Sequence, residues 1–214
     1  DLYHFAPEGP LDHRIGGDTF PFSQRELPYR NHVFHLSLAP GKHRFLVRVE
    51  AKGLVAAMLK LWTPAGLDAR FQATYLRAGL YFGFIAAALL AALVLAVSLK
   101  SPPALLFAGT ILSHGLSNVS AWGLSHQFFF PEDPAFADQL TGPLVLSVSL
   151  FSWWFFAMLL ELRRYHPWFY RVSQAGIGVS GLALVLSPFG YYQALSPLVQ
   201  GFAVAFVLGA PPVA

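Results

Sequence analysis

The chain contains no cysteine, and charged residues make up only 12% of its 214 residues. Without cysteine there can be no disulfide and no thiolate-held metal site. An ordinary soluble domain is roughly 25% charged, so much of this chain does not face water. The first methionine is Met58, and no cleavable signal peptide precedes Asp1. We therefore expect the chain to be a piece of a longer protein.

The few charges are concentrated in the first third of the sequence. Residues 1–74 hold nine of the 14 Lys and Arg residues and seven of the 11 Asp and Glu residues. The apolar excess, 55% over the whole chain, therefore belongs mainly to residues 75–214. The composition predicts two domains: a water-facing domain over 1–74 and a membrane region over 75–214.

Alternation of apolar and polar residues predicts three short strands in the first domain. They are Val33–Leu38, Phe45–Glu50 and Met58–Trp62. We expect the first two to form an antiparallel hairpin around the turn residues Pro40 and Gly41. The expected buried residues of the hairpin are Phe34, Leu36, Phe45, Val47 and Val49. Three short strands cannot bury a two-layer core alone, so the expected fold is the C-terminal part of a β-sandwich.

Histidines are frequent in this domain, with five of the eight between His4 and His43. His32 and His35 are three residues apart on a predicted strand, so their side chains should point to opposite faces. No acidic or cysteine partner stands at a ligand spacing. The sequence therefore predicts no metal site, and no cofactor-binding motif is present.

Five apolar runs follow residue 74, and they predict an α-helical transmembrane bundle. The runs cover residues 75–99, 104–124, 140–160, 170–186 and 198–214. About 20 apolar residues cross the hydrocarbon core of a bilayer. A soluble domain of this size has too little polar surface to enclose five such helices. The lipid bilayer is therefore the expected partner of this region.

Basic residues lie in alternate links between the predicted helices. The links on one side contain Lys100, Arg163, Arg164 and Arg171, whereas the links 125–139 and 187–197 contain no Lys or Arg. Basic links are retained on the cytoplasmic side. We therefore expect a multi-pass protein of the cell inner membrane with a periplasmic or extracellular N-terminal domain.

Two polar patterns lie inside the predicted helices. His114, Ser117 and Asn118 fall on one helical face, and Ser180 lies within Gly178-Val179-Ser180-Gly181. Together they resemble rhomboid intramembrane proteases, which implies Ser180 as nucleophile and His114 and Asn118 as oxyanion donors. A serine nucleophile needs a base, and no histidine follows His166. We favour a polar relay formed by hydrogen bonds between helices, and keep the protease as an alternative.

A membrane transporter is a further alternative, but transporters place charges near the midplane of the bilayer. Every charge after Tyr75 stands at or near the end of a predicted helix.

Small residues in the predicted helices suggest sites of helix packing, since Gly79 and Gly83 form a GxxxG motif that favours close helix contact. We expect Gly79, Gly83, Gly178 and Gly181 to pack helices within the bundle or between the subunits of a homodimer.

The order of elements resembles that of a known family. The residues that carry the resemblance in the first domain are Gly17–Arg25, Tyr29–Asn31, Phe34–Gly41 and Phe45–Val49. Those in the membrane region are Tyr81–Gly83, Gly123-Leu124, Phe130-Pro131, Leu159–Leu162 and Pro167. The pattern is similar to the bacterial seven-transmembrane receptors with diverse intracellular signalling modules. It matches the end of their extracellular jelly-roll domain and about five of their helices.

This resemblance implies a signal-transducing receptor. The outer domain would sense a small extracytoplasmic ligand such as a carbohydrate, and the helices would relay its binding to a cytoplasmic module of the kinase or nucleotide-cyclase type. The chain itself would contain no catalytic residue and would not be an enzyme. Nothing in the sequence predicts a nucleic-acid partner.

Overall fold

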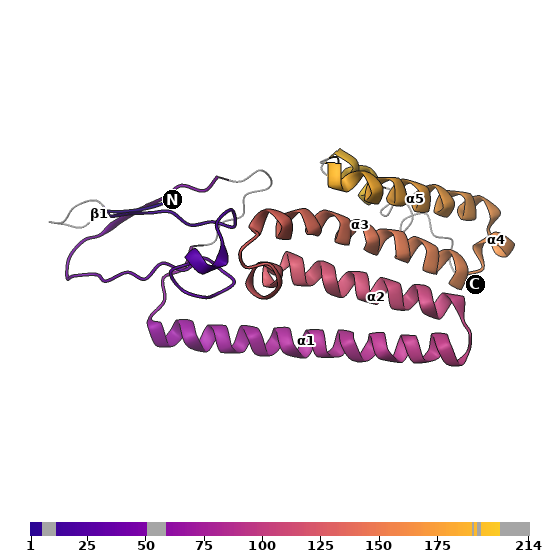
Figure 1. Cartoon of the computed structure of the whole chain (residues 1–214), viewed down its shortest axis with the longest axis horizontal. Helices are drawn as coiled ribbons and strands as arrows, with labels where there is room; N and C mark the ends of the chain where they lie inside the picture. The colour runs from indigo at the N-terminus through magenta and orange to yellow at the C-terminus, as the bar shows by residue number, and fades with distance from the viewer. Residues whose placement is uncertain (6–11, 51–58, 190, 192–193, 202–214) are drawn as a thin grey trace.

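The computed structural model describes residues 1–5, 12–50, 59–189, 191 and 194–201. The molecule is elongated: a small β-containing region lies at one end, and long helices run side by side from it to the other end (Figure 1). The N-terminal domain and the helical region are thus arranged end to end.

The N-terminal domain contains a three-stranded antiparallel sheet with the order β2-β1-β3. The strands are β1 (Leu2–Phe5), β2 (Asp12–Arg14) and β3 (Arg44–Val47). The central strand β1 pairs Leu2 with Arg14 on one side and with Val47 on the other. A single-turn helix, η1 (Phe22–Gln24), lies in the segment between β2 and β3.

The predicted hairpin between residues 33–38 and 45–50 is wrong, because β3 pairs with β1 and residues 33–38 form no strand. Side chains satisfy the backbone of this segment instead. The Arg14 guanidinium donates to the His35 carbonyl at 2.6 Å, and the His35 N–H donates to the Glu26 carboxylate at 3.0 Å. The predicted third strand is also wrong from Leu59 to Trp62, which are irregular, while Met58 lies outside the described residues.

The burial predicted for the hairpin holds only in part. Phe34, Leu36 and Val47 are half-buried, whereas Phe45 and Val49 are 38% and 48% exposed. The physical reason is that the sheet is a single layer, with no second sheet over it among the described residues. The predicted antiparallel sheet is therefore present, but the described residues do not contain the second sheet of the predicted β-sandwich.

The first predicted transmembrane run belongs to a much longer helix, α1 (Pro64–Ser98). It begins at Pro64 rather than at Tyr75, because Thr63 caps the helix with its side-chain oxygen and proline is favoured in the first turn. At 1.5 Å per residue its 35 residues extend about 52 Å. That exceeds the roughly 30 Å hydrocarbon core, so the first turns of α1 form a stalk outside the bilayer.

The helices α2 (Pro102–Ala121) and α5 (Pro167–Leu186) follow the predicted runs to within three residues, whereas α3 (Pro134–Leu159) begins six residues before the predicted run at 140, because Asp133 caps it. A short helix, α4 (Leu162–Tyr165), joins α3 to α5, and η3 (Ser187–Phe189) continues α5. Residues 194–201 are helical and contain the start of the fifth predicted run, while 202–214 lie outside the described residues. In Figure 1 the order across the bundle is α1, α2, α3, α5.

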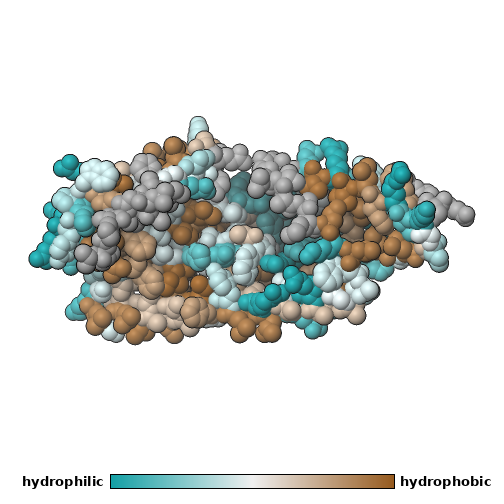
Figure 2. Space-filling view, turned by 180° about the vertical axis from the view of Figure 1, so that it is seen from behind, coloured by the Kyte–Doolittle hydropathy of each residue, from teal (hydrophilic) through white to brown (hydrophobic). Residues whose placement is uncertain are grey.

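Three of the described helical segments are long and apolar enough to cross a membrane: α1, α3 and α5 with η3. The helix α2 is less apolar, because it contains serine, threonine, histidine and asparagine. It lies between α1 and α3, with Ser113, Ser117 and Ser120 buried. Apolar side chains dominate the outer face of α1, along the lower edge of the molecule in Figure 2. The expected membrane protein with an outer β domain and a helical bundle is confirmed.

Glycines bring the helices of the bundle together, but not the glycines that the sequence suggested. A Cβ at Gly109 would lie 2.8 Å from the Phe151 ring, and one at Gly176 would lie 2.8 Å from the Trp153 indole. A Cβ at Gly79, Gly83 or Gly178 would meet nothing within 4 Å, and one at Gly181 would make only ordinary contact with Leu150 at 4.0 Å. The GxxxG motif of α1 therefore does not mediate contact among the described helices.

Candidate functional site

The N-terminal domain is bonded directly to the link between α2 and α3. The Phe22 N–H donates to the Pro131 carbonyl at 2.7 Å, and the Ser23 hydroxyl donates to the Glu132 carboxylate at 3.1 Å. Both donors belong to η1, at the closest approach of the domain to this link. We call the contact region of residues 22–32, 68–75 and 122–132 the outer junction.

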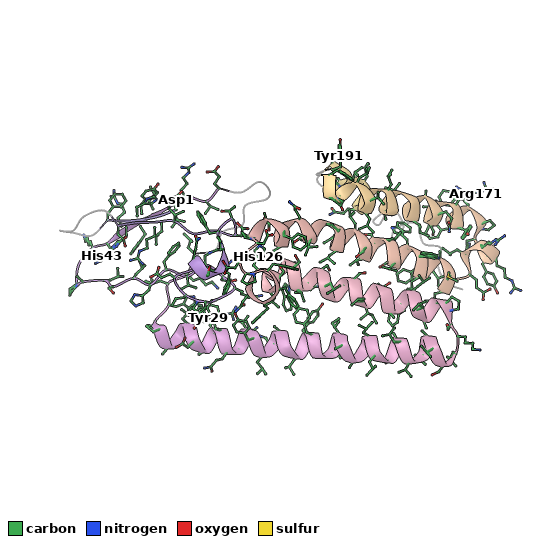
Figure 3. All side chains as sticks on the ribbon, in the orientation of Figure 1. Asp1, Tyr29, His43, His126, Arg171 and Tyr191 are labelled. Atoms are coloured by element: carbon green, nitrogen blue, oxygen red, sulfur yellow. The ribbon has the colours of Figure 1, made fainter. Side chains whose placement is uncertain are left out.

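An aromatic stack fastens the domain to the stalk of α1. The rings of Tyr29 and Phe71 are 3.6 Å apart and tilted by only 4°, and Phe71 is 7% exposed. The Tyr29 hydroxyl donates to the Asp68 carboxylate at 3.0 Å. This hydrogen bond raises the pKa of Tyr29, so the phenol stays protonated and remains a donor. Figure 3 shows Tyr29 beside the first turns of α1.

A second contact reaches deeper, to the outer part of the bundle. The Arg30 guanidinium donates to the Trp122 carbonyl at 3.3 Å and lies 5.9 Å from the centre of the indole ring. The same indole packs against Tyr81 and Phe82 of α1, with ring centres 5.0 and 5.4 Å away. Trp122 thus contacts both the N-terminal domain and the first membrane helix.

Gln127 provides a third contact, from η2 (Ser125–Phe129), a short π-helical turn after α2. Its side-chain oxygen accepts a hydrogen bond from the Tyr75 hydroxyl at 2.8 Å. Its side-chain nitrogen donates to the Pro28 carbonyl at 3.4 Å. One amide therefore connects α1, the α2–α3 link and the N-terminal domain.

Titratable groups of the outer junction are partly shielded from water: Arg25 is half-buried and His126 is buried. The Arg25 guanidinium donates to the carbonyls of Tyr29 and Arg30 at 2.9 and 2.6 Å, and burial lowers its pKa. Burial and the charge of Arg25 both lower the pKa of His32, which keeps that imidazole neutral at pH 7. Nearby, the buried His126 lies 3.6 Å from the Asp138 carboxylate. The junction is therefore a polar, partly desolvated contact.

Gly123 sits where the end of α2 meets the junction. Its φ is +72°, and a Cβ there would lie 3.7 Å from the Arg30 carbonyl oxygen. We expect Gly123→Ala to destabilise the protein by about 1–2 kcal/mol, because a residue with a side chain is strained in the left-handed region. Thermal unfolding in detergent, compared with Gly79→Ala, measures this effect. An unchanged melting temperature for Gly123→Ala would contradict it.

The residues of the predicted polar relay lie on α2, but they bond within that helix. The Ser117 hydroxyl and the Asn118 amide both donate to the His114 carbonyl, at 2.9 and 2.8 Å. Ser117 is buried, Asn118 is half-buried, and the His114 side chain is exposed on the outside of the described bundle. The structure therefore does not bring these three side chains into a hydrogen bond between described helices, and the relay stays a prediction.

The residues of the protease alternative are not assembled. Ser180 lies on α5, 1% exposed, and its hydroxyl has no hydrogen-bond partner among the described residues. His114 and Asn118 lie on α2, and α3 packs between the two helices (Figure 1). The described arrangement therefore gives Ser180 neither a neighbouring base nor the predicted oxyanion donors.

One hydrogen bond between helices was missed by sequence reasoning. Ser120 of α2 and Thr141 of α3 share a hydrogen bond of 2.5 Å. Ser113, Ser117 and Ser120 recur at helical spacing along the buried face of α2. This periodicity was the signal that could have identified the face packed against α3. The junction residues, by contrast, lie mostly in irregular segments that carry no periodic signal.

The sheet end of the N-terminal domain holds an open pocket of about 460 Å³ lined by Phe5, Lys42, His43 and Arg44. Behind it, His4 and His43 share a hydrogen bond of 2.9 Å, and His4 stacks on Phe45 at 4.7 Å. Among the described residues no three His, Asp or Glu side chains are grouped so that they could hold a metal ion. The pocket combines an aromatic ring with positive charge.

A helical membrane bundle bonded at one end to a small β domain, with its basic links at the other end, has the architecture of a transmembrane receptor. Arg171 lies at that second end in Figure 3. The family model described as 7TM diverse intracellular signalling matches residues 74–211, and the one described as 7TMR-DISM extracellular 2 matches residues 1–63. The chain belongs to the family of seven-transmembrane receptors with diverse intracellular signalling, as its resemblance predicted. Comparison with curated proteins and with solved structures found no match.

Proposed function

We propose that the N-terminal domain binds a small extracytoplasmic ligand and that the outer junction transmits this binding to the membrane helices. The stack of Tyr29 on Phe71 carries the proposal. Phe71 belongs to the stalk of α1, and the same helix continues without interruption to Ser98 on the cytoplasmic side. A movement of the N-terminal domain would therefore act directly on a transmembrane helix.

The ligand class that fits the outer pocket best is a carbohydrate carrying an acidic group. Phe5 offers an aromatic ring face, while Lys42 and Arg44 offer positive charge for a carboxylate. Small-ligand pockets combine such apolar surface with a few polar groups that fix orientation. This chemistry supports an acidic saccharide over a neutral one.

We further propose that the protein lies in the cell inner membrane. The cytoplasmic end of its bundle would regulate a cytoplasmic signalling module of the kinase or nucleotide-cyclase type. The family supports a cytoplasmic signalling partner. The chain itself would not be an enzyme, a proposal supported by the burial of Ser180 and by its separation from His114.

A homodimer formed through α1 is part of the same proposal. Gly79 and Gly83 have open space beside them, and the nearby Leu76, Leu80 and Phe84 are 66%, 68% and 74% exposed. Small residues flanked by apolar side chains allow two membrane helices to approach closely. A second copy of α1 would cover this face.

Cross-linking across the outer junction tests the receptor mechanism. The chain has no cysteine, so a Ser23→Cys, Glu132→Cys variant reports this one contact with a short bismaleimide reagent. We expect one or more members of a panel of uronic acids and their oligomers to change the cross-linking yield in a saturable manner. We expect Lys42→Gln to raise the half-saturating concentration about tenfold, since it removes a charge-assisted contact.

Neutral sugars of the same size are the ligand control, and Lys60→Gln is the variant control because Lys60 lies outside the pocket. Binding of the same saccharides is measured separately by isothermal titration calorimetry, and if no uronic acid or neutral sugar binds, the carbohydrate class is wrong. If a saccharide binds but the junction yield stays constant, the proposed route of transmission is wrong.

A further inference from the structure

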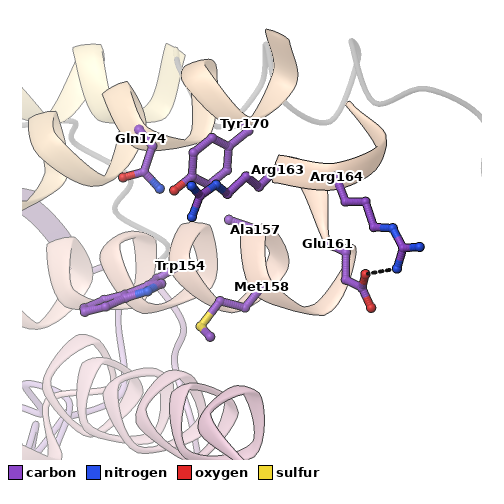
Figure 4. A pocket seen from close by; sticks show the side chains of 8 residues that line it. All are labelled: Trp154, Ala157, Met158, Glu161, Arg163, Arg164, Tyr170 and Gln174. Atoms are coloured by element: carbon purple, nitrogen blue, oxygen red, sulfur yellow. Dashed lines mark ion pairs between the residues drawn. The ribbon is translucent and has the colours of Figure 1, made fainter. Parts of the chain in front are cut away.

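The end of the bundle opposite the outer junction holds a second pocket, of about 640 Å³, between α3, α4 and α5. Its lining combines aromatic, apolar, polar and charged side chains: Trp154, Ala157, Met158, Glu161, Arg163, Arg164, Tyr170 and Gln174 (Figure 4). In this family the N-terminal region is extracellular, so this pocket faces the cytoplasmic leaflet. Neither the ligand nor the junction proposed above involves it.

The two neighbouring arginines of α4, Arg163 and Arg164, make different contacts. Arg164 lies 3.7 Å from the Glu161 carboxylate and 5.4 Å from the centre of the Tyr165 ring. Glu161 has a φ of 44°, which turns the chain sharply at the end of α3. Figure 4 shows the Arg163 side chain pointing toward Tyr170, while the Arg164 side chain pairs with Glu161 on another side of the pocket. Arg163 has no ion pair among the described residues, so its charge is available to a ligand.

The rest of the pocket is amphipathic and firmly supported. Trp154 and Met158 are 47% and 38% exposed and provide its apolar side. The buried cluster of Ala157, Leu162 and Phe169 lies behind α4 and fixes it between α3 and α5. An apolar wall below a free guanidinium, at the level where the apolar helices end, suits a molecule with an acyl chain and an anionic head.

We propose that this pocket binds an anionic phospholipid of the cytoplasmic leaflet. Arg163 would pair with the phosphate, while the Tyr170 hydroxyl and the Gln174 amide would donate hydrogen bonds to its oxygens. The upper part of an acyl chain would lie along Trp154 and Met158. Basic pockets between membrane helices on the cytoplasmic side recognise acidic head groups in this way.

The charge at this end of the bundle favours the lipid over an acidic protein segment. The links at this end of the bundle contain one acidic residue, Glu161, and four basic ones: Lys100, Arg163, Arg164 and Arg171. The cytoplasmic leaflet is itself negative. Trp168, 72% exposed beside the pocket, belongs to the residue type that gathers at the membrane interface. A lipid offers an anionic head group for Arg163 and an acyl chain for the apolar wall. An acidic peptide segment offers the negative charge without the acyl chain.

Native mass spectrometry of the full chain in detergent tests the proposal. Phosphatidylglycerol and phosphatidylcholine with the same acyl chains are titrated as probes. We expect saturable binding of one phosphatidylglycerol and weaker, unsaturated binding of phosphatidylcholine. Arg163→Gln should weaken phosphatidylglycerol binding about five- to tenfold, since it removes one basic residue from the head group.

Arg171→Gln is the matched control, because it removes the same charge at the same end of the bundle from an exposed residue that does not line the pocket; its affinity should stay within about twofold of that of the unchanged chain. Arg163→Lys keeps the charge without the guanidinium fork and should give an intermediate affinity. It also provides a readout if Arg163→Gln fails to fold. Equal losses of affinity for Arg163→Gln and Arg171→Gln would mean diffuse attraction to the surface and would overturn the site.

Two further arms distinguish the source of the phosphate. Inorganic phosphate and glycerol 3-phosphate, at the lipid concentrations used, should not displace phosphatidylglycerol. Displacement by either would show that the pocket recognises a soluble anion and would overturn the lipid proposal. Displacement by an acidic peptide at micromolar concentration would overturn it in favour of a protein segment.

The position of the acyl chain is tested by fluorescence. Quenching of tryptophan fluorescence by brominated phosphatidylglycerol should be smaller in Trp154→Phe, and unchanged quenching would contradict the assigned position of the acyl chain.

Discussion

Gly176→Ala is expected to destabilise the helical bundle by about 1–3 kcal/mol, the usual cost of overpacking a close contact. The new Cβ would lie 2.8 Å from two atoms of the Trp153 indole. Trp153 is 4% exposed and belongs to α3, so its ring has little space into which to move. The helices α3 and α5 must therefore separate, which weakens the packing between them.

Gly178→Ala provides the control, since a Cβ at Gly178 would meet nothing within 4 Å. Both variants gain the same helix propensity, about 1 kcal/mol for Gly to Ala, so the difference between them isolates the packing. Unfolding in mixed micelles by increasing concentrations of a denaturing detergent gives both free energies. If Gly176→Ala is as stable as Gly178→Ala, the close contact of α3 with α5 is wrong.

The second large effect is expected from Phe71→Ala in the stalk of α1. The substitution removes a nearly buried ring and its stack on Tyr29. Truncating a buried phenylalanine costs about 3–5 kcal/mol. Because the loss falls on the outer junction, we expect the N-terminal domain to detach from α1 while the contacts among α2, α3 and α5 persist.

The Ser23→Cys, Glu132→Cys pair measures this detachment directly. We expect the cross-linking yield to fall strongly in Phe71→Ala. Val97→Ala is the control, because Val97 lies on the same helix, far from the stack, and is 77% exposed. An unchanged yield in Phe71→Ala would show that the stack does not hold the two parts together. Loss of yield in Val97→Ala as well would indicate general damage to α1.

The helices were predictable because their signals are local. Long apolar runs identified α1, α3 and α5, and alternating basic links predicted which end of the bundle faces the cytoplasm. The start of α1 was placed at Tyr75 because the run becomes apolar there, although Thr63 and Pro64 form a recognisable helix start. Helix boundaries outside a membrane are set by capping residues rather than by hydropathy.

The remaining features depend on contacts between distant residues. Residues 33–38 alternate as a strand does, yet Arg14 and Glu26 bond the His35 backbone and leave β1 to pair with β3. The spacing of Gly79 and Gly83 says nothing about the direction in which they face. Gly109 and Gly176, in contrast, contact large aromatic rings of α3 that no local pattern could assign to them.

The helix α1 is fixed at its outer end by the N-terminal domain and exposed along one side. Its outer turns are fixed by Tyr29, and along its length it packs against α2, while most of its surface faces outward. It contains no proline after Pro64, whereas α3 contains Pro143 in its interior. A movement applied to α1 at Tyr29 would therefore meet no missing backbone hydrogen bond between Pro64 and Ser98, whereas Pro143 removes one such bond inside α3. We therefore expect α1 to transmit a displacement along its axis more rigidly than α3.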